Sequence, residues 1–318
     1  MNLRIGSRGS QLALWQANHI AGLLRGQGHS VEIEIIKTTG DRMQEVTFAQ
    51  VGSKGMFTKE IEEALAEGRI DLAVHSLKDL PTDLPDPFAL AATPVRVDPR
   101  DVFVSIRHAN VAELPQAAKV GTSSQRRRAQ LKAIRPDIDA VEFRGNVDTR
   151  LRKLAEGQVE AILLAAAGLD RLGKTDWVRE RLDPKYFCPA AGQGALGIEA
   201  RKGDDATLAA LAFLDHAGTR FAVTAERAAL SALGGGCQVP IGIHCRRDHA
   251  KDGAIDGGHE IFGVVASPDS GEVARIHLHA PLEDTDPQVF GKLAATALLE
   301  TGASRLLGVA REAPGGAA

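Results

Sequence analysis

The sequence has few of the residues that mark secreted or membrane-bound proteins. It contains three cysteines in 318 residues, too few and too irregularly spaced for a disulfide framework. No stretch approaches the ~18 consecutive apolar residues of a membrane span. The N-terminal segment MNLRIGSRGS also lacks the apolar core of a signal peptide. We therefore expect a cytoplasmic protein with no membrane partner.

Neither sign of charge is in excess, and aromatic residues are scarce. The 38 lysines and arginines nearly balance the 41 aspartates and glutamates, and aromatic residues make up 4% of the chain. A surface that follows a nucleic-acid backbone needs a basic excess and aromatic stacking groups. We expect no nucleic-acid partner, although the run Arg126–Arg128 keeps that function open as an alternative.

Hydrophobic residues make up 44% of the chain, and their periodicity predicts two α/β regions followed by a smaller α+β region. Proline and charge interrupt the pattern between residues 81 and 100, where we expect a hinge. The predicted strands lie at 3–5, 31–35, 70–74, 102–104, 120, 140–143, 161–164, 241 and 261–265. The predicted helices include 12–23, 57–65, 223–233 and 289–299.

An arginine run follows a predicted strand end, in the segment GTSSQRRR at 121–128. Ser123 or Ser124 is suited to cap the helix that begins there. Arginines in the first turn oppose the helix dipole, so the run predicts a bound carboxylate or phosphate. A solvated basic face is the alternative.

Two more predicted strand ends carry arginine. Arg144 and Arg150 flank the start of the helix that follows residue 143, and Arg8 follows the first strand. Ligands of open α/β sheets bind at the carboxyl ends of strands, and guanidinium groups pair bidentately with carboxylates. The three junctions together predict a polyanionic ligand held between two domains.

Asp79 is an acid in this basic setting, directly after Lys78 at the end of a predicted strand. A carboxylate is poorly suited to bind anions, but it stabilises a cation that forms during a reaction or transfers a proton. The alternative is a turn cap before Leu80 and Pro81.

Cys237 follows three glycines, which permit close approach of another molecule to its sulfur. This setting favours a reactive or modified thiol, and a small buried hydrophobe is the alternative.

A metal site built from Cys237, Cys245, His249 and His259 matches no compact zinc spacing, so we expect no metal. His277 and His279 share one side of a strand and are interpreted as surface residues without nearby partners.

Five segments closely resemble the signature segments of the porphobilinogen deaminase family, in the same order along nearly the whole chain. They are VHSLKDLP at 74–81, GTSS with the following arginines at 121–128, RGNV at 144–147, AGQG at 191–194 and GCQVP at 236–240. Each segment alone is a weak signal, whereas five with compatible spacing are specific.

The resemblance implies two doubly wound domains similar to periplasmic binding proteins, with a cleft between them, and a smaller α+β C-terminal domain. The implied domains are 1–96 with 194–214, 99–191 and 217–312. It also implies a cytoplasmic, monomeric transferase of tetrapyrrole and heme biosynthesis. Such an enzyme condenses porphobilinogen head to tail on a dipyrromethane primer, releasing ammonia and then hydroxymethylbilane.

The resemblance further implies residue roles. Cys237 holds the dipyrromethane through a thioether, and Asp79 stabilises the cationic pyrroles of the reaction. The cofactor is also bound by Ser76, Lys78, Asp79, Thr122, Ser123, Ser124, Arg126, Arg127, Arg144 and Arg150. The substrate is bound by Arg8, Ser10, Arg144, Arg150, Arg171, Gln193 and the lid residues Lys54 and Phe57.

Two positions depart from the family pattern. Gln50 stands where a lysine is expected near the lid, and Gly234 stands where an acidic residue usually precedes the Gly-Gly-Cys segment. Cys188 and Cys245 are expected to have no role. A non-enzymatic carboxylate-binding protein with the same two lobes remains the main alternative, but it leaves Asp79 and Cys237 unexplained.

Overall fold

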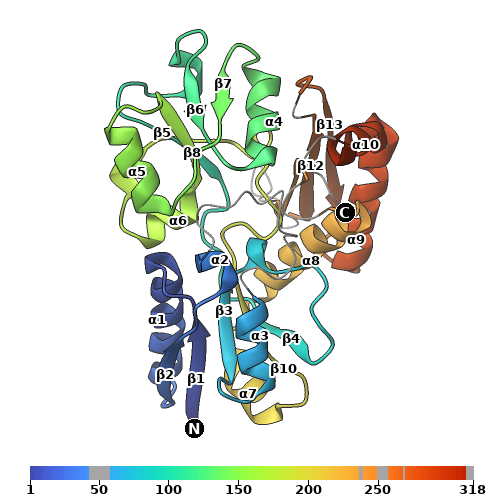
Figure 1. The fold of residues 1–318 in the computed structure, drawn as a ribbon. Coiled ribbons are helices and arrows are strands. Elements are labelled where there is room, and N and C mark those ends of the chain that lie inside the picture. The colour runs from blue at the N-terminus through green and yellow to red at the C-terminus, as the bar shows by residue number, and fades with distance from the viewer. Residues whose placement is uncertain (43–57, 236–238, 249–256, 268, 313–318) are drawn as a thin grey trace. The chain divides into compact units, whose positions relative to one another are not determined.

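The computed structural model describes residues 1–42, 58–235, 239–248, 257–267 and 269–312. The chain divides into two compact units, one formed by Met1–Val97 with Gly194–Arg220 and the other by Asp98–Gln193 with Phe221–Ala318. Figure 1 labels the elements of both units. The boundary at Val97 lies within the predicted hinge. The division into three domains is not tested by these units and stays a prediction.

The first unit contains a five-stranded mixed sheet in the order β2-β1-β3-β10-β4. Strands β1, β2 and β3 run parallel, and β10 is antiparallel to both β3 and β4. The strands are β1 (Asn2–Ser7), β2 (Ser30–Ile35), β3 (Leu72–Ser76), β4 (Phe88–Ala92) and β10 (Leu196–Arg201). The helices are α1 (Gln11–Gly26), α2 (Thr39–Arg42), α3 (Lys59–Ala66), the 3-10 turn η1 (Leu77–Asp79), α7 (Asp205–Leu211) and η4 (Ala212–Leu214).

Apolar residues cover both faces of this sheet. Leu3 and Ile5 of β1 pack with Ile20 and Leu24 of α1 on one face. On the other face, Ile61 of α3 packs in a second cluster with Ala73 of β3. Burial of both faces produces the near-continuous apolar strands that the sequence shows.

The second unit contains another five-stranded mixed sheet, in the order β7-β6-β8-β5-β9. Its two faces bury separate clusters, one with Leu131 of α4 and the other with Leu151 of α5. The strands are β5 (Asp101–Ser105), β6 (Lys119–Gly121), β7 (Asp139–Val141), β8 (Ala161–Ala165) and β9 (Val178–Arg181). The helical segments are η2 (Val111–Glu113), α4 (Gln125–Ile134), α5 (Val147–Ala155), α6 (Ala166–Arg171) and η3 (Thr175–Trp177).

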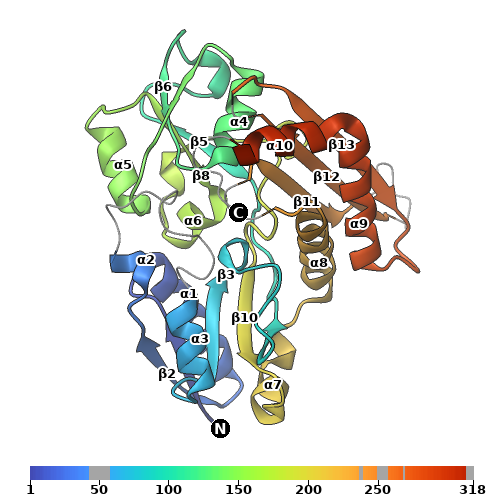
Figure 2. The ribbon, with the colours of Figure 1, turned by 45° about the vertical axis from the view of Figure 1, so that its right-hand side comes forward.

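The same unit also carries a three-stranded antiparallel sheet, β11-β12-β13. Its strands are β11 (Ile241–Arg247), β12 (His259–Ala266) and β13 (Val273–Ala280). Helices α9 (Pro287–Leu298) and α10 (Ser304–Glu312), joined by η5 (Leu299–Ala303), lie along this sheet, as Figure 2 shows. With α8 (Ala217–Ala232) they bury one face of it.

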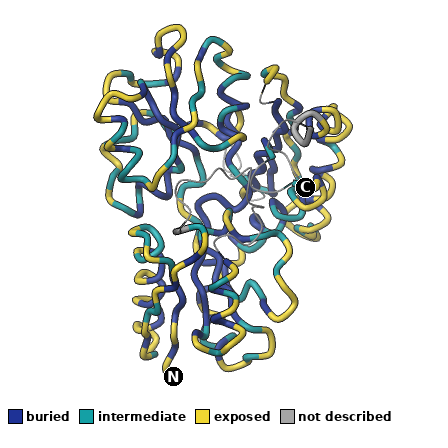
Figure 3. Tube along the Cα trace, in the orientation of Figure 1, coloured by how far each residue is buried: buried dark blue, intermediate teal, exposed yellow. Residues whose placement is uncertain are grey.

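The predicted α/β class, with two sheet-based regions and a smaller α+β C-terminal part, is confirmed by these sheets. Figure 3 shows that buried backbone is concentrated in the strands and exposed backbone in the loops and outer helix faces. Strands β4, β9 and β10 were not among the predicted strands, whereas the strand expected at His277 and His279 is β13. Within the described residues, no helix combines the length and hydropathy that crossing a membrane requires.

Candidate functional site

In the first unit, the predicted site residues gather at one edge of the sheet. Strands β1 and β3 are parallel neighbours, so Arg8 after β1 and Asp79 after β3 follow strand ends on the same edge. Ser10 caps α1, because its hydroxyl accepts a hydrogen bond from the amide of Ala13 at 3.3 Å. Ser76 accepts one from Gln16 Nε2 at 2.8 Å. These contacts fix the backbone on which the edge is built.

Asp79 ends the turn η1 and is exposed. Among the described residues, no hydrogen bond or ion pair of its carboxylate is found. The turn is closed by the backbone, with the amide of Leu80 donating to the carbonyl of Leu77 at 3.2 Å. Asp79 therefore does not act as a turn cap in the described structure, and its carboxylate is accessible.

A buried polar pair lies in the strands behind this edge. Nε2 of His75 lies 2.9 Å from Oε2 of Glu199, and both side chains are buried. The other carboxylate oxygen of Glu199 has no hydrogen-bond partner among the described residues. Burial raises the pKa of Glu62 in α3, and the charge of Glu199 adds to that shift. The sequence signal was a glutamate inside the otherwise apolar strand LGIEA, and it was not recognised.

In the second unit, the arginine junctions also meet at one sheet edge. Strand β6 pairs in parallel with both β7 and β8, so the helices that follow all three strands begin on that edge. Ser124 is the N-cap of α4, where its hydroxyl accepts from the amide of Arg127. Asn146 caps α5 in the same way. Ser123 instead donates to the carbonyl of Phe143 at 2.7 Å, which ties the two junctions together.

Arg126 and Arg127 have a buried partner that the sequence pattern did not reveal. Both side chains point to Asp101 at the start of β5, whose exposed fraction is 0%. Its carboxylate accepts from Arg126 Nη1 at 2.5 Å and from Arg127 Nε at 2.8 Å. Burial opposes ionisation of Asp101, but the two guanidinium charges outweigh it and hold its pKa well below the usual range. For these two arginines, the protein itself supplies an anion.

Gln193 belongs to the same network. It is buried, and its amide nitrogen donates to the carbonyl of Pro99 at 2.8 Å and to Asp101 at 3.0 Å. The preceding Gly192 donates its amide to the buried carboxylate of Glu226 in α8 at 2.6 Å. Hydrogen bonds of two adjacent residues, Gly192 and Gln193, therefore hold the AGQG segment in place. The contact of Gln193 with the substrate stays a prediction.

Arg150 differs from the other arginines of this edge. Its side chain is half-buried, and Nε has no hydrogen-bond partner among the described residues. Burial, with the nearby charge of Arg127, lowers its pKa to about 10. Burial also lowers the pKa of Arg171 to about 10, and Arg144 pairs with Glu142 at 2.8 Å. A half-buried guanidinium whose burial is only partly offset, here by the charge of Glu142, is costly, so Arg150 fits an anionic cofactor.

Several predicted residues lie outside the described residues: Cys237, Lys54, Phe57, Gln50 and His249. Gly234 is described and has a φ of +62°, two residues after the end of α8 at Ala232. An acidic residue would be strained in this left-handed conformation, which accounts for glycine at that position.

The two described cysteines are buried. Burial raises the pKa of the Cys188 thiol to about 12, so little reactive thiolate forms at neutral pH. Cys245 belongs to the core between the C-terminal sheet and its helices.

His277 and His279 are exposed, as expected of surface residues, but the expectation that they lack nearby partners is wrong. Strand pairing places Glu260 directly opposite His279, and Nε2 of His277 lies 2.7 Å from Oε2 of Glu260. The residue pattern along one strand does not indicate which residues lie opposite on the neighbouring strand, so the sequence did not predict Glu260 as a partner.

Two family models match the chain. Residues 3–209 match porphobilinogen deaminase, dipyromethane cofactor binding domain, and residues 220–300 match porphobilinogen deaminase, C-terminal domain. A porphobilinogen deaminase from Trichlorobacter lovleyi is 48% identical over 308 residues, covering 96% of this chain and 95% of the relative. One from Nitratidesulfovibrio vulgaris is 51% identical over 275 residues, covering 86% of this chain and 85% of the relative.

Solved structures also align with part of the chain. A lipoprotein of the YaeC family from Enterococcus faecalis aligns with a TM-score of 0.44 at 12% identity, covering 67% of this chain and 91% of that one. A TRAP periplasmic solute binding protein from Desulfovibrio salexigens aligns with a TM-score of 0.41 at 11% identity, covering 68% of this chain and 72% of that one.

Proposed function

Because the chain belongs to the porphobilinogen deaminase family, we propose that it condenses porphobilinogen head to tail on a dipyrromethane primer carried by Cys237. Each condensation releases ammonia, and hydrolysis releases the linear tetrapyrrole hydroxymethylbilane. The transferase activity and the dipyrromethane cofactor are those of the family. Their assignment to individual residues is our proposal, and the observation that carries it is the accessible carboxylate of Asp79, which has no hydrogen bond or ion pair among the described residues.

Asp79 is proposed as the catalytic carboxylate. Loss of ammonia from porphobilinogen leaves positive charge on the substrate pyrrole, and a nearby carboxylate stabilises that charge as it develops. When bound, the dipyrromethane supplies the nucleophilic pyrrole carbon that the first substrate unit joins. An acid already engaged in a cap or an ion pair would serve this role poorly, and Asp79 makes neither contact among the described residues.

The arginines are proposed to bind the acetate and propionate groups of cofactor and substrate. The half-buried guanidinium of Arg150 supports this role because its Nε has no hydrogen-bond partner among the described residues and the charge of Glu142 offsets its burial only in part. Thr122, Ser123 and Ser124 would hold the helix start from which that charge is presented. Arg126 and Arg127 are also proposed to bind the cofactor, and their hydrogen bonds with Asp101 orient both side chains.

Cys237 is proposed to carry the cofactor through a thioether. The thiol of Cys188 supports this choice by elimination, because its raised pKa makes it a poor nucleophile. Intact-mass measurement tests the attachment. The purified protein should exceed its sequence mass by one dipyrromethane, and Cys237→Ser should remove both that increment and the activity. Full activity in a protein of unmodified mass contradicts the attachment.

The catalytic role is tested with Asp79→Asn beside the control Asp83→Asn. Both aspartates are exposed and lie in the same loop region, and both substitutions keep the shape of the side chain. We expect single-turnover ammonia release from cofactor-loaded protein to fall by about 10²–10⁴ in the first variant and to stay unchanged in the second. A rate for Asp79→Asn within about threefold of wild type refutes the assignment, since a catalytic carboxylate contributes more.

We further propose a cytoplasmic monomer without a nucleic-acid partner, supported by the near balance of 38 basic and 41 acidic residues. Light scattering during size-exclusion chromatography tests the monomer directly. A carboxylate-binding protein without catalysis, the earlier alternative, would bind porphobilinogen but release no ammonia.

A further inference from the structure

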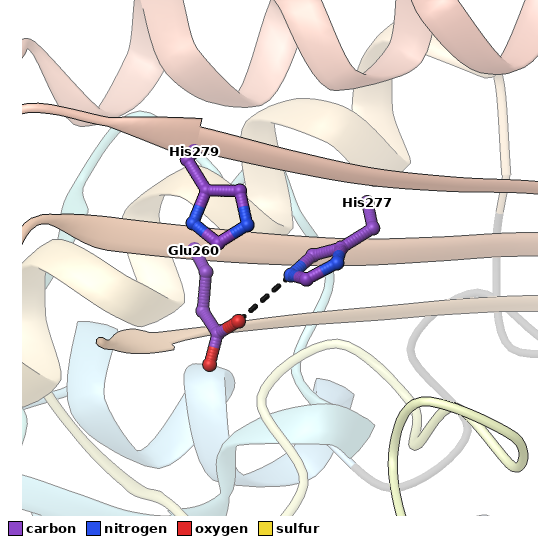
Figure 4. Close-up of side chains that lie close together, drawn as sticks. All are labelled: Glu260, His277 and His279. Atoms are coloured by element: carbon purple, nitrogen blue, oxygen red, sulfur yellow. Dashed lines mark hydrogen bonds and ion pairs between the residues drawn. The ribbon is translucent and has the colours of Figure 1, made fainter. Parts of the chain in front are cut away.

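Two histidines and a glutamate lie together on one face of the C-terminal sheet. His277 and His279 are two residues apart on β13, so their side chains share a face. On β12, Glu260 pairs with His279, and Phe262 pairs with His277. Figure 4 shows the three polar side chains next to one another above the strands. One potential ligand atom from each lies within 4.8 Å of the other two.

These side chains are already held in place. Glu260 is 5% exposed, and its Oε1 accepts from Arg246 Nε at 2.5 Å while Oε2 faces His277. The His277 ring stacks on Phe262, with 4.2 Å between ring centroids. Partners that orient metal ligands are a regular feature of metal sites. Here the contact with the exposed Arg246 and the aromatic ring of Phe262 have that effect.

We propose that Glu260, His277 and His279 form a binding site for a divalent transition-metal ion such as Zn²⁺. Two imidazole nitrogens and one carboxylate oxygen are a donor set that zinc accepts, with water in the fourth position. Imidazole ligands favour zinc, copper and nickel over magnesium and calcium. Both histidine side chains are partly exposed, at 38% and 56%, so an ion and its water can reach them.

The geometry requires only a small adjustment. Ligand atoms bound at ~2.1 Å to a tetrahedral ion lie ~3.4 Å apart. The present separations run from 2.7 Å between His277 and Glu260 to at most 4.8 Å within the group. Shifts on the order of 1 Å therefore bring the donors to bonding distance. The exposed ring of His279 can make such a shift by side-chain rotation.

Two further charges face the site. Arg246 disfavours a cation, although its contact is with the carboxylate oxygen that points away from His277. Asp248 favours a cation, because its Oδ2 lies 3.6 Å from Nδ1 of His279. The two effects oppose each other, and Glu260 itself leaves the site with a net negative charge. Bound metal would link β12 to β13 and stabilise the sheet by linkage. None of the three ligands is among the residues proposed for catalysis.

The site is tested by zinc titration of the cofactor-loaded protein after removal of metal with EDTA. The test variants are His277→Asn and His279→Asn. His108→Asn is the matched control. His108 also lies near a carboxylate, that of Glu160 at 3.5 Å, but among the described residues this pair is not part of a group of three potential metal ligands. Cobalt spectra report the ligand type, and melting temperatures in EDTA show that each variant is folded.

We expect saturable binding of one zinc per chain and a melting temperature that rises with zinc. Each test variant should weaken binding by at least the ~10-fold that loss of an orienting partner costs, while the control keeps wild-type affinity and all variants keep their activity in EDTA. The proposal is overturned if wild type shows no saturable binding, if both test variants bind as wild type does, or if cobalt shows thiolate coordination.

Discussion

Asp101→Asn tests whether a buried carboxylate anchors the arginines at the start of α4. The wild-type side chain is fully buried and contacts Arg126, Arg127 and Gln193 at 2.5, 2.8 and 3.0 Å. Asparagine keeps the shape but leaves two buried guanidinium groups without their shared counter-ion. Breaking a buried pair in this way costs about 3–5 kcal/mol. A domain is stable by only about 5–15 kcal/mol, so the second unit should be severely destabilised.

The loss is measured by urea unfolding in a Trp15→Phe background. The chain has two tryptophans, and Trp177 then reports on the second unit alone. Asp98→Asn is the control, because Asp98 pairs with Arg100 and Arg181 at 2.7 and 2.8 Å but in a more exposed setting. Exposed pairs are worth about 0.2–1 kcal/mol. If Asp101→Asn lowers the free energy of unfolding no more than Asp98→Asn does, the anchoring role is refuted.

The same variant has a pH signature. The pKa of Asp101 is lowered in the folded state from its ordinary value of 3.8. Its contribution to stability is therefore complete above that value and is lost as the pH falls towards the folded-state pKa. The difference in unfolding free energy between wild type and Asp101→Asn should be constant from pH 7 to about pH 5 and narrow below about pH 4. A difference as wide at pH 3 as at pH 7 contradicts the ionised, ion-paired carboxylate.

Three other substitutions separate binding from folding. Arg150→Leu should leave the melting temperature of cofactor-free protein unchanged or raised, because it removes a half-buried charge, yet it should impair cofactor loading measured by intact mass; Arg152→Leu, at an exposed ion pair on the same helix, should alter neither. Glu199→Gln should cost about 1–3 kcal/mol in urea unfolding followed by Trp15, and no loss would show that the contact with His75 contributes nothing. Native Cys188 should resist iodoacetamide at pH 8 and react only after unfolding, and rapid labelling of the folded protein would contradict its raised pKa.

Local periodicity predicted the elements whose partners are close in sequence, and it failed where pairing is long-range. The alternation of β2 and the helical spacing of α1 were sufficient because each element has a continuous apolar pattern. Strand β4 has only the short run FALAA among prolines, and its neighbour β10 lies more than a hundred residues later, with Ala92 paired to Ile198. No local pattern encodes such a pairing, so the segment looked like a loop.

The buried acids were missed for the same reason. Asp101 follows Arg100 and precedes an apolar strand, so by sequence it resembles a strand-starting surface residue. Its burial results from the network that Arg126, Arg127 and Gln193 form around it. Glu199 offered a better signal, because an acid inside a strand buried on both faces must find a partner. A charged residue in an apolar strand therefore predicts a buried pair, even when the partner cannot be named.

The arginine run shows that an electrostatic argument from sequence can indicate an anion without identifying which anion it is. Arginines at a helix start do require negative charge nearby, and the sequence suggested that a ligand supplies it. For Arg126 and Arg127 a carboxylate of the same unit supplies it, so their presence alone would not reveal a ligand site. Arg150 makes the stronger case, because the fold half-buries its charge, leaves its Nε without a hydrogen-bond partner among the described residues, and offsets the burial only in part through the charge of Glu142. A fold seldom retains a destabilising buried charge without a functional reason. We therefore expect a substitution that removes the charge of Arg150 to stabilise the cofactor-free protein and, at the same time, to weaken cofactor binding.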